Sequence, residues 1–155
     1  MSKAIFPGTF DPVTLGHEGL VRRALKIFDA IVIGIGANSE KKTLFSQEQR
    51  LAMLKATFAD SKNISIEIFE GLTVDFAKKM GATTIIRGIR NGIDLEYEKP
   101  ISAINHELNP DIETVFIVPD GSTSHISSSL VREVIKYKGR LDTLIPAAAI
   151  RLIQA

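Results

Sequence analysis

The sequence has no cysteine among its 155 residues. This absence excludes a disulfide framework, a thiolate zinc site, an iron–sulfur cluster and a cysteine nucleophile. A chain of this length needs no disulfide, because a domain of ~150 residues buries roughly 70% of the surface that its unfolded chain exposes. We therefore expect residues 1–155 to form a single domain.

An excess of charge of one sign is also missing. Lys and Arg together number 19, and Asp and Glu number 18, so the formal net charge is +1. A protein without a strong overall field does not bind nucleic acid or acidic membranes non-specifically, so we expect neither as a partner. Any site for an anionic ligand must therefore be local.

Long apolar runs are absent as well. The most apolar stretch, from Phe28 to Ala37, contains Asp29 and is about half of the ~20 residues needed to span a bilayer. The amino terminus leads directly into the run at 4–6, without the apolar core and cleavage site of a signal peptide. These features predict a cytoplasmic protein.

Short apolar runs, most of them rich in β-branched residues, alternate with amphipathic segments. The runs predict strands at 4–6, 30–35, 64–69, 83–86 and 114–118. Most of them show no apolar–polar alternation, which is typical of parallel strands buried on both faces. The run at 64–69 does alternate, so we expect it to be an edge strand.

Helical periodicity predicts helices between and after these strands, at 17–28, 46–58, 73–80, 101–108, 127–137 and 147–153. Ser46 and Gln49 form a capping-box pattern, and Gly81 is a typical helix stop. Right-handed crossovers then predict an α/β fold, a doubly wound, Rossmann-like sheet of five parallel strands with helices on both faces. In such folds ligands bind beyond the carboxyl ends of the strands.

The first candidate site is the loop after the first strand, residues 7–17. Gly8 and Gly16 allow the backbone to approach a ligand closely, and the helix that follows presents free N–H groups to an anion. His17 lies in the first turn of that helix, where it can donate to a phosphate oxygen. An isolated loop histidine more often binds a backbone carbonyl, but the surrounding glycines and the helix start favour phosphate.

Two further loops carry groups that can bind anions. Arg87 and Arg90 follow the fourth strand, and guanidinium groups match the geometry of phosphate. Ser127 is a natural N-cap, and the serines after it extend a second helix-start cradle. A solvated turn is the alternative for the two arginines, and also for Lys41 and Lys42 after the second strand. A flexible serine-rich loop is the alternative for the last segment.

Other familiar nucleotide-binding and metal-binding motifs are incomplete or missing from the sequence. Residues 34–36 begin a dinucleotide fingerprint, but Ser39 stands where its third glycine belongs. No glycine loop ends in Gly-Lys-Ser/Thr, which excludes a P-loop. The three histidines are scattered along the chain, so no protein-built metal site is predicted.

Four segments, in this order and over nearly the whole chain, carry a resemblance to a known family: PGTFDPVTLGH at 7–17, IRGIR at 86–90, EYE at 96–98 and ISSSLV at 126–131. Together they resemble the bacterial phosphopantetheine adenylyltransferases of the nucleotidylyltransferase superfamily. The resemblance implies transfer of the adenylyl group of ATP to 4′-phosphopantetheine, giving dephospho-coenzyme A and pyrophosphate. It also implies that the domain at 1–155 is a nucleotidylyltransferase domain.

The resemblance implies a role for each matching residue. His17 would be the catalytic residue and would stabilise the transition state. The substrate-binding residues would be Thr9, Lys41, Thr73 and Arg87. The ATP site would be lined by Thr9, Phe10, His17, Gly88, Ile89, Arg90, Glu98, Thr123, Ser124, His125, Ile126, Ser127, Ser128 and Ser129.

The resemblance further implies Mg²⁺ and a homohexamer, with coenzyme A as a candidate feedback ligand. The sequence shows no acidic cluster for a metal cage, so we expect Mg²⁺ to arrive on ATP and to keep several waters. A phosphate acceptor suits a site without an obvious base, because the second pKa of a phosphate is about 6 and the group is mostly ionised at pH 7.

Three segments depart from the family pattern: Asn91-Gly92 is a looser turn than expected, residues 120–122 form a more flexible loop, and a proline interrupts the segment after Glu98. Pro100 follows Lys99 directly after Glu98, where an uninterrupted helix is expected. Proline disfavours helical conformation at the residue before it, so the sequence predicts a helix that starts near Pro100 and leaves Glu98 at its edge.

Three alternatives stay open at this point. A sister enzyme, a nicotinamide mononucleotide adenylyltransferase or a cytidylyltransferase, shares the first and last loops, although the segments at 86–90 and 96–98 argue against it. A non-catalytic nucleotide-binding module would keep the cradles but does not need His17 or Lys41. A dinucleotide-dependent oxidoreductase is disfavoured by the broken glycine pattern at 34–39.

Overall fold

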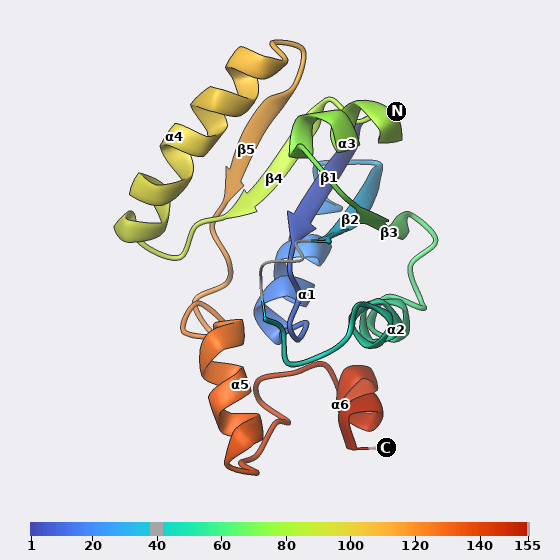
Figure 1. Ribbon diagram of the computed structural model, residues 1–155, viewed down its shortest axis with the longest axis vertical. Coiled ribbons are helices and arrows are strands. Elements are labelled where there is room, and N and C mark those ends of the chain that lie inside the picture. The colour runs from blue at the N-terminus through green and yellow to red at the C-terminus, as the bar shows by residue number, and fades with distance from the viewer. Residues whose placement is uncertain (38–41, 155) are drawn as a thin grey trace.

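Strands and helices alternate along residues 1–37 and 42–154, the part of the chain that the computed structural model describes (Figure 1). The strands are β1 (Lys3–Gly8), β2 (Ala30–Gly36), β3 (Ile64–Phe69), β4 (Thr84–Gly88) and β5 (Glu113–Ile117). The helices are α1 (Leu15–Ala24), α2 (Gln47–Thr57), α3 (Thr73–Met80), α4 (Gly92–Leu108), α5 (Ser128–Lys136) and α6 (Ala147–Gln154). None of these helices is long and apolar enough to cross a membrane.

The strands form one sheet in the order β3-β2-β1-β4-β5, and every neighbouring pair is parallel. This confirms the predicted doubly wound α/β sheet of five parallel strands. It also confirms the edge position of 64–69, because β3 pairs with β2 alone. Ser65 and Glu67 of this strand are exposed while Ile64 and Ile66 are half-buried, so one of its faces is open to solvent, which explains the alternation.

Neighbouring residues of the central strands enter different apolar clusters. Phe6 and Ile33 pack in a cluster with residues of α1, α2, α5 and α6. Ile5 and Ile85 pack in the other with residues of α3. Helices therefore cover both faces, as predicted, while α4 lies alongside β5 and also contacts α3 (Figure 1).

The order of the strands places a switch point between β1 and β4. From β1 the chain moves through α1 to β2 on one side, and α3 brings it back to β4 on the other. Crevices for ligands open where successive crossovers depart in opposite directions. The carboxyl ends of β1 and β4 are therefore the place where this fold positions a site.

The fourth strand is longer than its predicted range of 83–86. It continues through Arg87 and Gly88, which pair in register with Phe116 and Ile117 of β5. Backbone pairing with β5 keeps these two residues in the strand, although an arginine and a glycine after an apolar run predict a loop. Arg87 is thus mounted on the sheet rather than on a free loop.

The prediction of a helix that starts near Pro100 is wrong, because α4 begins at Gly92 and runs through Pro100. The Asn91 side chain accepts the N–H of Asp94 at 3.0 Å and caps the helix eight residues earlier. The N–H that Pro100 lacks would bond the carbonyl of Glu96, and both residues are exposed, so water can take its place. Glu98 is consequently a buried residue inside the helix.

Candidate functional site

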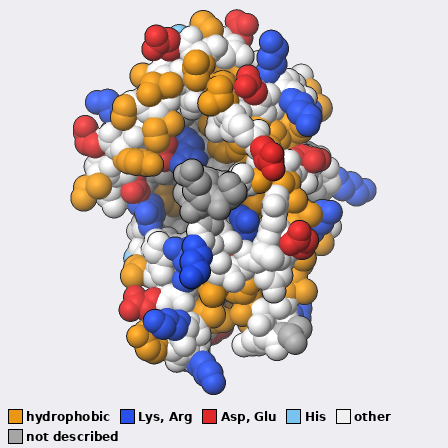
Figure 2. Space-filling view, viewed as in Figure 1, with side chains coloured by type: hydrophobic (Ala, Val, Ile, Leu, Met, Phe, Trp, Pro, Cys, Tyr) orange, Lys and Arg blue, Asp and Glu red, His pale blue; other side chains and the backbone are white. Residues whose placement is uncertain are grey.

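A cleft of about 730 Å³ opens at the switch point, between the carboxyl ends of β1 and β4 and the starts of α1 and α5. Most of the predicted site residues line it: Thr9, Phe10, His17, Arg87, Gly88, Arg90, Glu98, Thr123, Ile126, Ser127, Ser128 and Ser129. Lys and Arg side chains gather near the middle of this face of the molecule (Figure 2). The fold thus brings three loops, distant in sequence, around one cationic cleft.

Five predicted residues are not placed in the lining. Thr73 is the first residue of α3, and Ile89 is buried behind the cleft, where its N–H donates to the carbonyl of Ile117 at 3.1 Å. Ser124 and His125 lie in the turn before α5 and also do not line the cleft. Lys41 lies outside the described residues, whereas its neighbour Lys42 lines the cleft.

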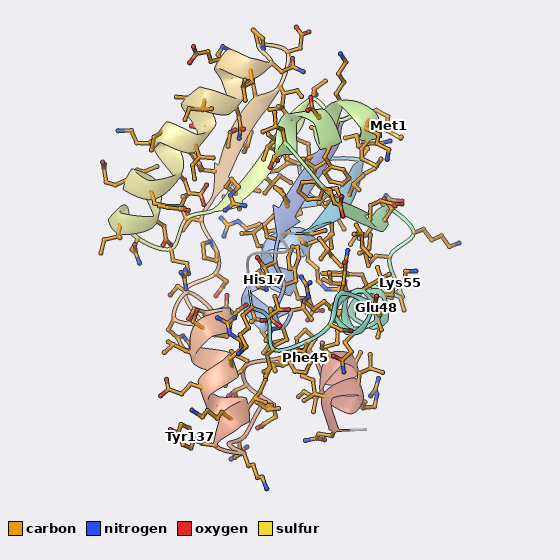
Figure 3. The ribbon with its side chains drawn as sticks, in the orientation of Figure 1. Met1, His17, Phe45, Glu48, Lys55 and Tyr137 are labelled. Atoms are coloured by element: carbon orange, nitrogen blue, oxygen red, sulfur yellow. The ribbon has the colours of Figure 1, made fainter. Side chains whose placement is uncertain are left out.

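His17 is fixed by the cap of its own helix. Thr14 is the N-cap of α1, and its hydroxyl accepts the N–H of His17 at 3.3 Å. In return the backbone N–H of Thr14 donates to Nδ1 of His17 at 3.0 Å. Because that N–H can only donate, Nδ1 is the unprotonated nitrogen, and Nε2 carries the hydrogen of the neutral ring. His17 therefore offers one N–H donor; the residue lies near the centre of the molecule in Figure 3.

The surroundings of His17 keep its ring neutral. Burial, and then the positive charges of Arg90 and Arg87, lower the pKa of His17 from 6.5 to about 4. Desolvation and nearby cations both disfavour the imidazolium form. The ring is thus a neutral hydrogen-bond donor at physiological pH, and is not a proton store.

Arg87 and Glu98 form a two-pronged ion pair across the cleft wall. Nη2 and Nε of Arg87 donate to the two carboxylate oxygens of Glu98 at 2.6 and 2.9 Å, and Nη1 donates to the carbonyl of Pro7 at 2.9 Å. Glu98 is only 7% exposed. Such a bidentate pair fixes the plane of the guanidinium, and it orients Arg87 between the ends of β1 and β4.

The segment before α5 packs against the loops that follow β1 and β4. Nη1 of Arg90 donates to the carbonyl of Ile126 at 3.3 Å, and the hydroxyl of Ser128 donates to the carbonyl of Pro12 at 3.0 Å. Ser127 is the N-cap of α5, as predicted, and its hydroxyl accepts the N–H of Leu130. The start of α5 therefore lines the same cleft as His17, in a position to bind an anion.

The sequence agrees with this geometry when it is compared with known proteins. Residues 5–134 match the cytidylyltransferase-like family. Phosphopantetheine adenylyltransferase of Flavobacterium johnsoniae is 51% identical over 148 residues, which cover 96% of this chain and 97% of that protein. The enzyme of the same name from Levilactobacillus brevis is 39% identical over 155 residues, covering 100% and 96%. The chain belongs to the phosphopantetheine adenylyltransferase family.

Membership of this family agrees with the fold. A crystal structure from Vibrio parahaemolyticus, named as a candidate nicotinate-nucleotide adenylyltransferase, superimposes with a TM-score of 0.76 over 100% of both chains. Its sequence is only 17% identical, so this likeness establishes the fold alone. The α/β fold predicted from the sequence is confirmed.

Several residues of the cleft escaped the prediction. Arg132 lines it from α5, and its Nη1 donates to the carbonyl of Asp11 at 2.8 Å. Asp11, Asp94 and Tyr97 line it as well. The spacing of Arg132, one helical turn after Ser129, could have indicated that both side chains face the same ligand. Thr14 was missed because its capping partner is a histidine and not the usual Glu or Gln.

The acidic residues of the cleft do not fit a protein-built metal site. Among the described residues, no group of three or more His, Asp or Glu side chains could hold an ion. The Asp11 carboxylate accepts two backbone N–H groups, Glu98 is paired with Arg87, and Asp94 is paired with Arg90. These carboxylates are already engaged by the protein itself.

Proposed function

We propose that this protein transfers the adenylyl group of ATP to 4′-phosphopantetheine, which gives dephospho-coenzyme A and pyrophosphate. The observation that carries the proposal is the neutral His17, whose Nε2–H is held by the Thr14 cap in a cleft lined by Arg87 and Arg90. The names of the full-length relatives support the choice of substrates.

The reaction needs no nucleophile from the protein. An oxygen of the acceptor phosphate attacks the α-phosphorus of ATP, the new P–O bond forms, and the bond to the β-phosphate oxygen breaks as pyrophosphate leaves. The acceptor is mostly ionised at pH 7, since the second pKa of a phosphate is about 6. What remains for the enzyme is to align the two phosphates and to stabilise the charge that develops on the transferring group.

The residues divide between the two ligands. His17 is the catalytic residue and donates Nε2–H to an α-phosphate oxygen, with Thr9 beside it. Arg87 and Lys41 bind the phosphate of phosphopantetheine, and Thr73 contacts the pantetheine arm. The ATP side comprises Phe10, Gly88, Ile89, Arg90, Glu98 and residues 123–129, with the start of α5 facing the β- and γ-phosphates.

A panel of nucleotides and acceptors tests this assignment. Pyrophosphate release is measured with ATP or CTP, each combined with 4′-phosphopantetheine or nicotinamide mononucleotide. We expect release only with ATP and 4′-phosphopantetheine. Release with CTP, or with nicotinamide mononucleotide, would assign the protein to a sister activity, and no release with any pair would indicate a non-catalytic nucleotide-binding module.

Magnesium enters this proposal with ATP. Because the carboxylates of the cleft are engaged, the ion would be held by the phosphates and by water, which is how Mg²⁺ commonly accompanies nucleotides. Coenzyme A shares the phosphopantetheine and adenylyl parts of the product, so we propose that it binds in the same cleft as a feedback ligand. ATP as co-substrate supports a cytoplasmic location, and the single sheet supports one domain over residues 1–155.

A homohexamer is also part of the proposal, and an apolar face of α4 supports contact between copies of the chain. Five large apolar side chains lie on one side of this helix and are exposed: Ile93, Tyr97, Ile101, Ile104 and Leu108. Exposed apolar faces of this kind mark protein–protein contacts. Sedimentation of the wild type and of Ile104→Glu tests it: we expect a hexamer that the charge dissociates, and a wild-type monomer would contradict it.

A further inference from the structure

Phe10 adopts a backbone conformation that is costly for its residue type. Its φ is 51°, in the left-handed region, although it is not a glycine, and the residue is only 3% exposed. A non-glycine residue in this region costs on the order of 1–3 kcal/mol and persists only where its surroundings hold it. The structure must therefore supply contacts that keep this residue of the first loop in place.

The residue before Phe10 is held from α2. Nη1 of Arg50 donates to the carbonyl of Thr9 at 2.8 Å, and Arg50 is only 6% exposed. Nε of Arg50 has no hydrogen-bond partner among the described residues. Burying a charged group costs folding free energy unless the group is well hydrogen-bonded. The buried Arg50 guanidinium donates to a carbonyl of the first loop, which points to a role in shaping that loop.

The residue after Phe10 is held from two other directions. The carboxylate of Asp11, 3% exposed, accepts the N–H of Leu44 at 2.8 Å and the N–H of Phe45 at 2.9 Å. Phe45 lies on the segment that leads into α2 (Figure 3). From α5, Nη1 of Arg132 donates to the carbonyl of Asp11 at 2.8 Å. Both neighbours of Phe10 are thus fixed by hydrogen bonds from other parts of the fold.

The held conformation determines where the Phe10 ring lies. Its centroid is 5.0 Å from the ring of His17 and 5.4 Å from that of Phe6, in edge-to-face arrangements. A Cβ added at Gly8 would come within 3.0 Å of the same ring, so the glycine makes room for it. An ordinary φ at Phe10 would turn its Cβ elsewhere and remove the ring from the side of His17.

We propose that Asp11 and Arg50 are positioning residues, which together clamp the first loop so that Phe10 supports the imidazole of His17 at the cleft. This inference rests on the proposed function in so far as His17 is its catalytic residue. Asp11 also links that loop to the segment at 42–45, from which Lys42 and Thr43 line the cleft. The clamp therefore joins the first loop to a second segment that lines the cleft.

The Phe10 ring lies close enough to His17 for its ring current to shift the NMR signal of the imidazole. That signal therefore reports whether the clamp holds Phe10 in place, and it can be measured in the protein without ligand. The chain has three histidines, so an imidazole ¹H–¹³C spectrum holds three Hε1 signals, and His17→Gln assigns that of His17. We expect Arg50→Met and Asp11→Asn to shift the His17 signal and to leave the other two in place. The matched controls are Arg140→Met and Asp142→Asn, which alter an exposed ion pair and should shift none of them.

Steady-state kinetics of the same variants supply the second readout. We expect kcat to fall on the order of 10-fold to 100-fold, as for a small misplacement of a reacting group, with smaller changes in KM. Arg50→Lys keeps a donor for the Thr9 carbonyl, and it should recover part of the kcat and of the His17 signal. If Arg50→Met does not fold, Arg50→Lys takes its place in both measurements.

The outcomes separate the clamp from the proposed reaction. A folded Arg50→Met or Asp11→Asn with an unmoved His17 signal would overturn the clamp, whatever its activity. A shifted signal with a normal kcat would overturn its link to catalysis. If wild-type protein forms no dephospho-coenzyme A, the proposed function fails, while the spectra still report on the clamp.

Discussion

The backbone N–H of Thr14 donates to Nδ1 of His17 across 3.0 Å, in the first turn of α1. One hydrogen bond thus caps a helix and fixes the tautomer of the proposed catalytic residue. Thr14 and His17 are coupled by it, so substitutions at His17 affect both the stability of α1 and the donor in the cleft.

Two substitutions at His17 separate these effects. Gln at the third helical position can keep the capping box, whereas Ala cannot. We expect His17→Ala to lower kcat by on the order of 10² or more, as for the loss of one oxyanion-type donor, and also to lower the melting temperature. His17→Gln should lower kcat with a smaller change in melting temperature. A near-normal kcat in His17→Ala would remove His17 from the mechanism.

The low pKa of His17 makes stability depend on pH in one direction. The native ring stays neutral down to about pH 4, while in the unfolded chain it gains a proton near 6.5. The unfolded state therefore binds more protons in this window, so stability falls as the pH is lowered from about 6.5 to about 4. Urea unfolding should show this loss in the wild type and not in His17→Gln; equal curves would contradict it.

The pair of Arg87 and Glu98 predicts an effect on the acceptor. Glu98→Gln keeps the size of the side chain but removes the charge that orients the guanidinium. Although Glu98 belongs to the ATP side, it holds Arg87, so we expect a higher KM for 4′-phosphopantetheine and a stability loss of roughly 1.5–3 kcal/mol. Arg87→Ala should raise the same KM. In the double variant Arg87→Ala/Glu98→Gln, the two increases in KM should not add. Additive increases would show that the two residues act independently.

Two N-cap serines provide a matched comparison. Ser127 caps α5 at the cleft, and Ser46 caps α2 away from its lining. Replacing either with Ala should lower stability by about 1 kcal/mol. Only Ser127→Ala should also raise the KM for ATP, because of these two helices only α5 begins at the cleft. An equal KM effect in both variants would refute the role of α5 in binding ATP.

Periodicity and turn chemistry were enough to predict the strands, the edge position of β3 and the caps at Ser46 and Ser127. The boundaries that failed were decided by tertiary contacts. Arg87 belongs to β4 because the ladder to β5 continues beyond the apolar run. The helix α4 passes through Pro100 because its cap at Asn91 starts it earlier and the carbonyl of Glu96, left without its N–H partner, is exposed to water.

The position of a residue in the cleft could be predicted where it belongs to a loop motif, as for His17 and Arg90. It was not predictable where one residue serves another across the fold. Asp11 reads as part of a loop motif, but its partners, Leu44 and Phe45, lie more than thirty residues away. The same holds for Arg50, whose hydrogen bond to the carbonyl of Thr9 forms only once α2 is packed.

Identification of the product by mass tests the central claim most directly. Wild-type protein is incubated with ATP, Mg²⁺ and 4′-phosphopantetheine, and the products are separated and weighed alongside those of His17→Ala. We predict dephospho-coenzyme A and pyrophosphate in equal amounts from the wild type, with a strongly reduced yield from the variant. Consumption of ATP without dephospho-coenzyme A, or no reaction of the wild type, would contradict the proposed function.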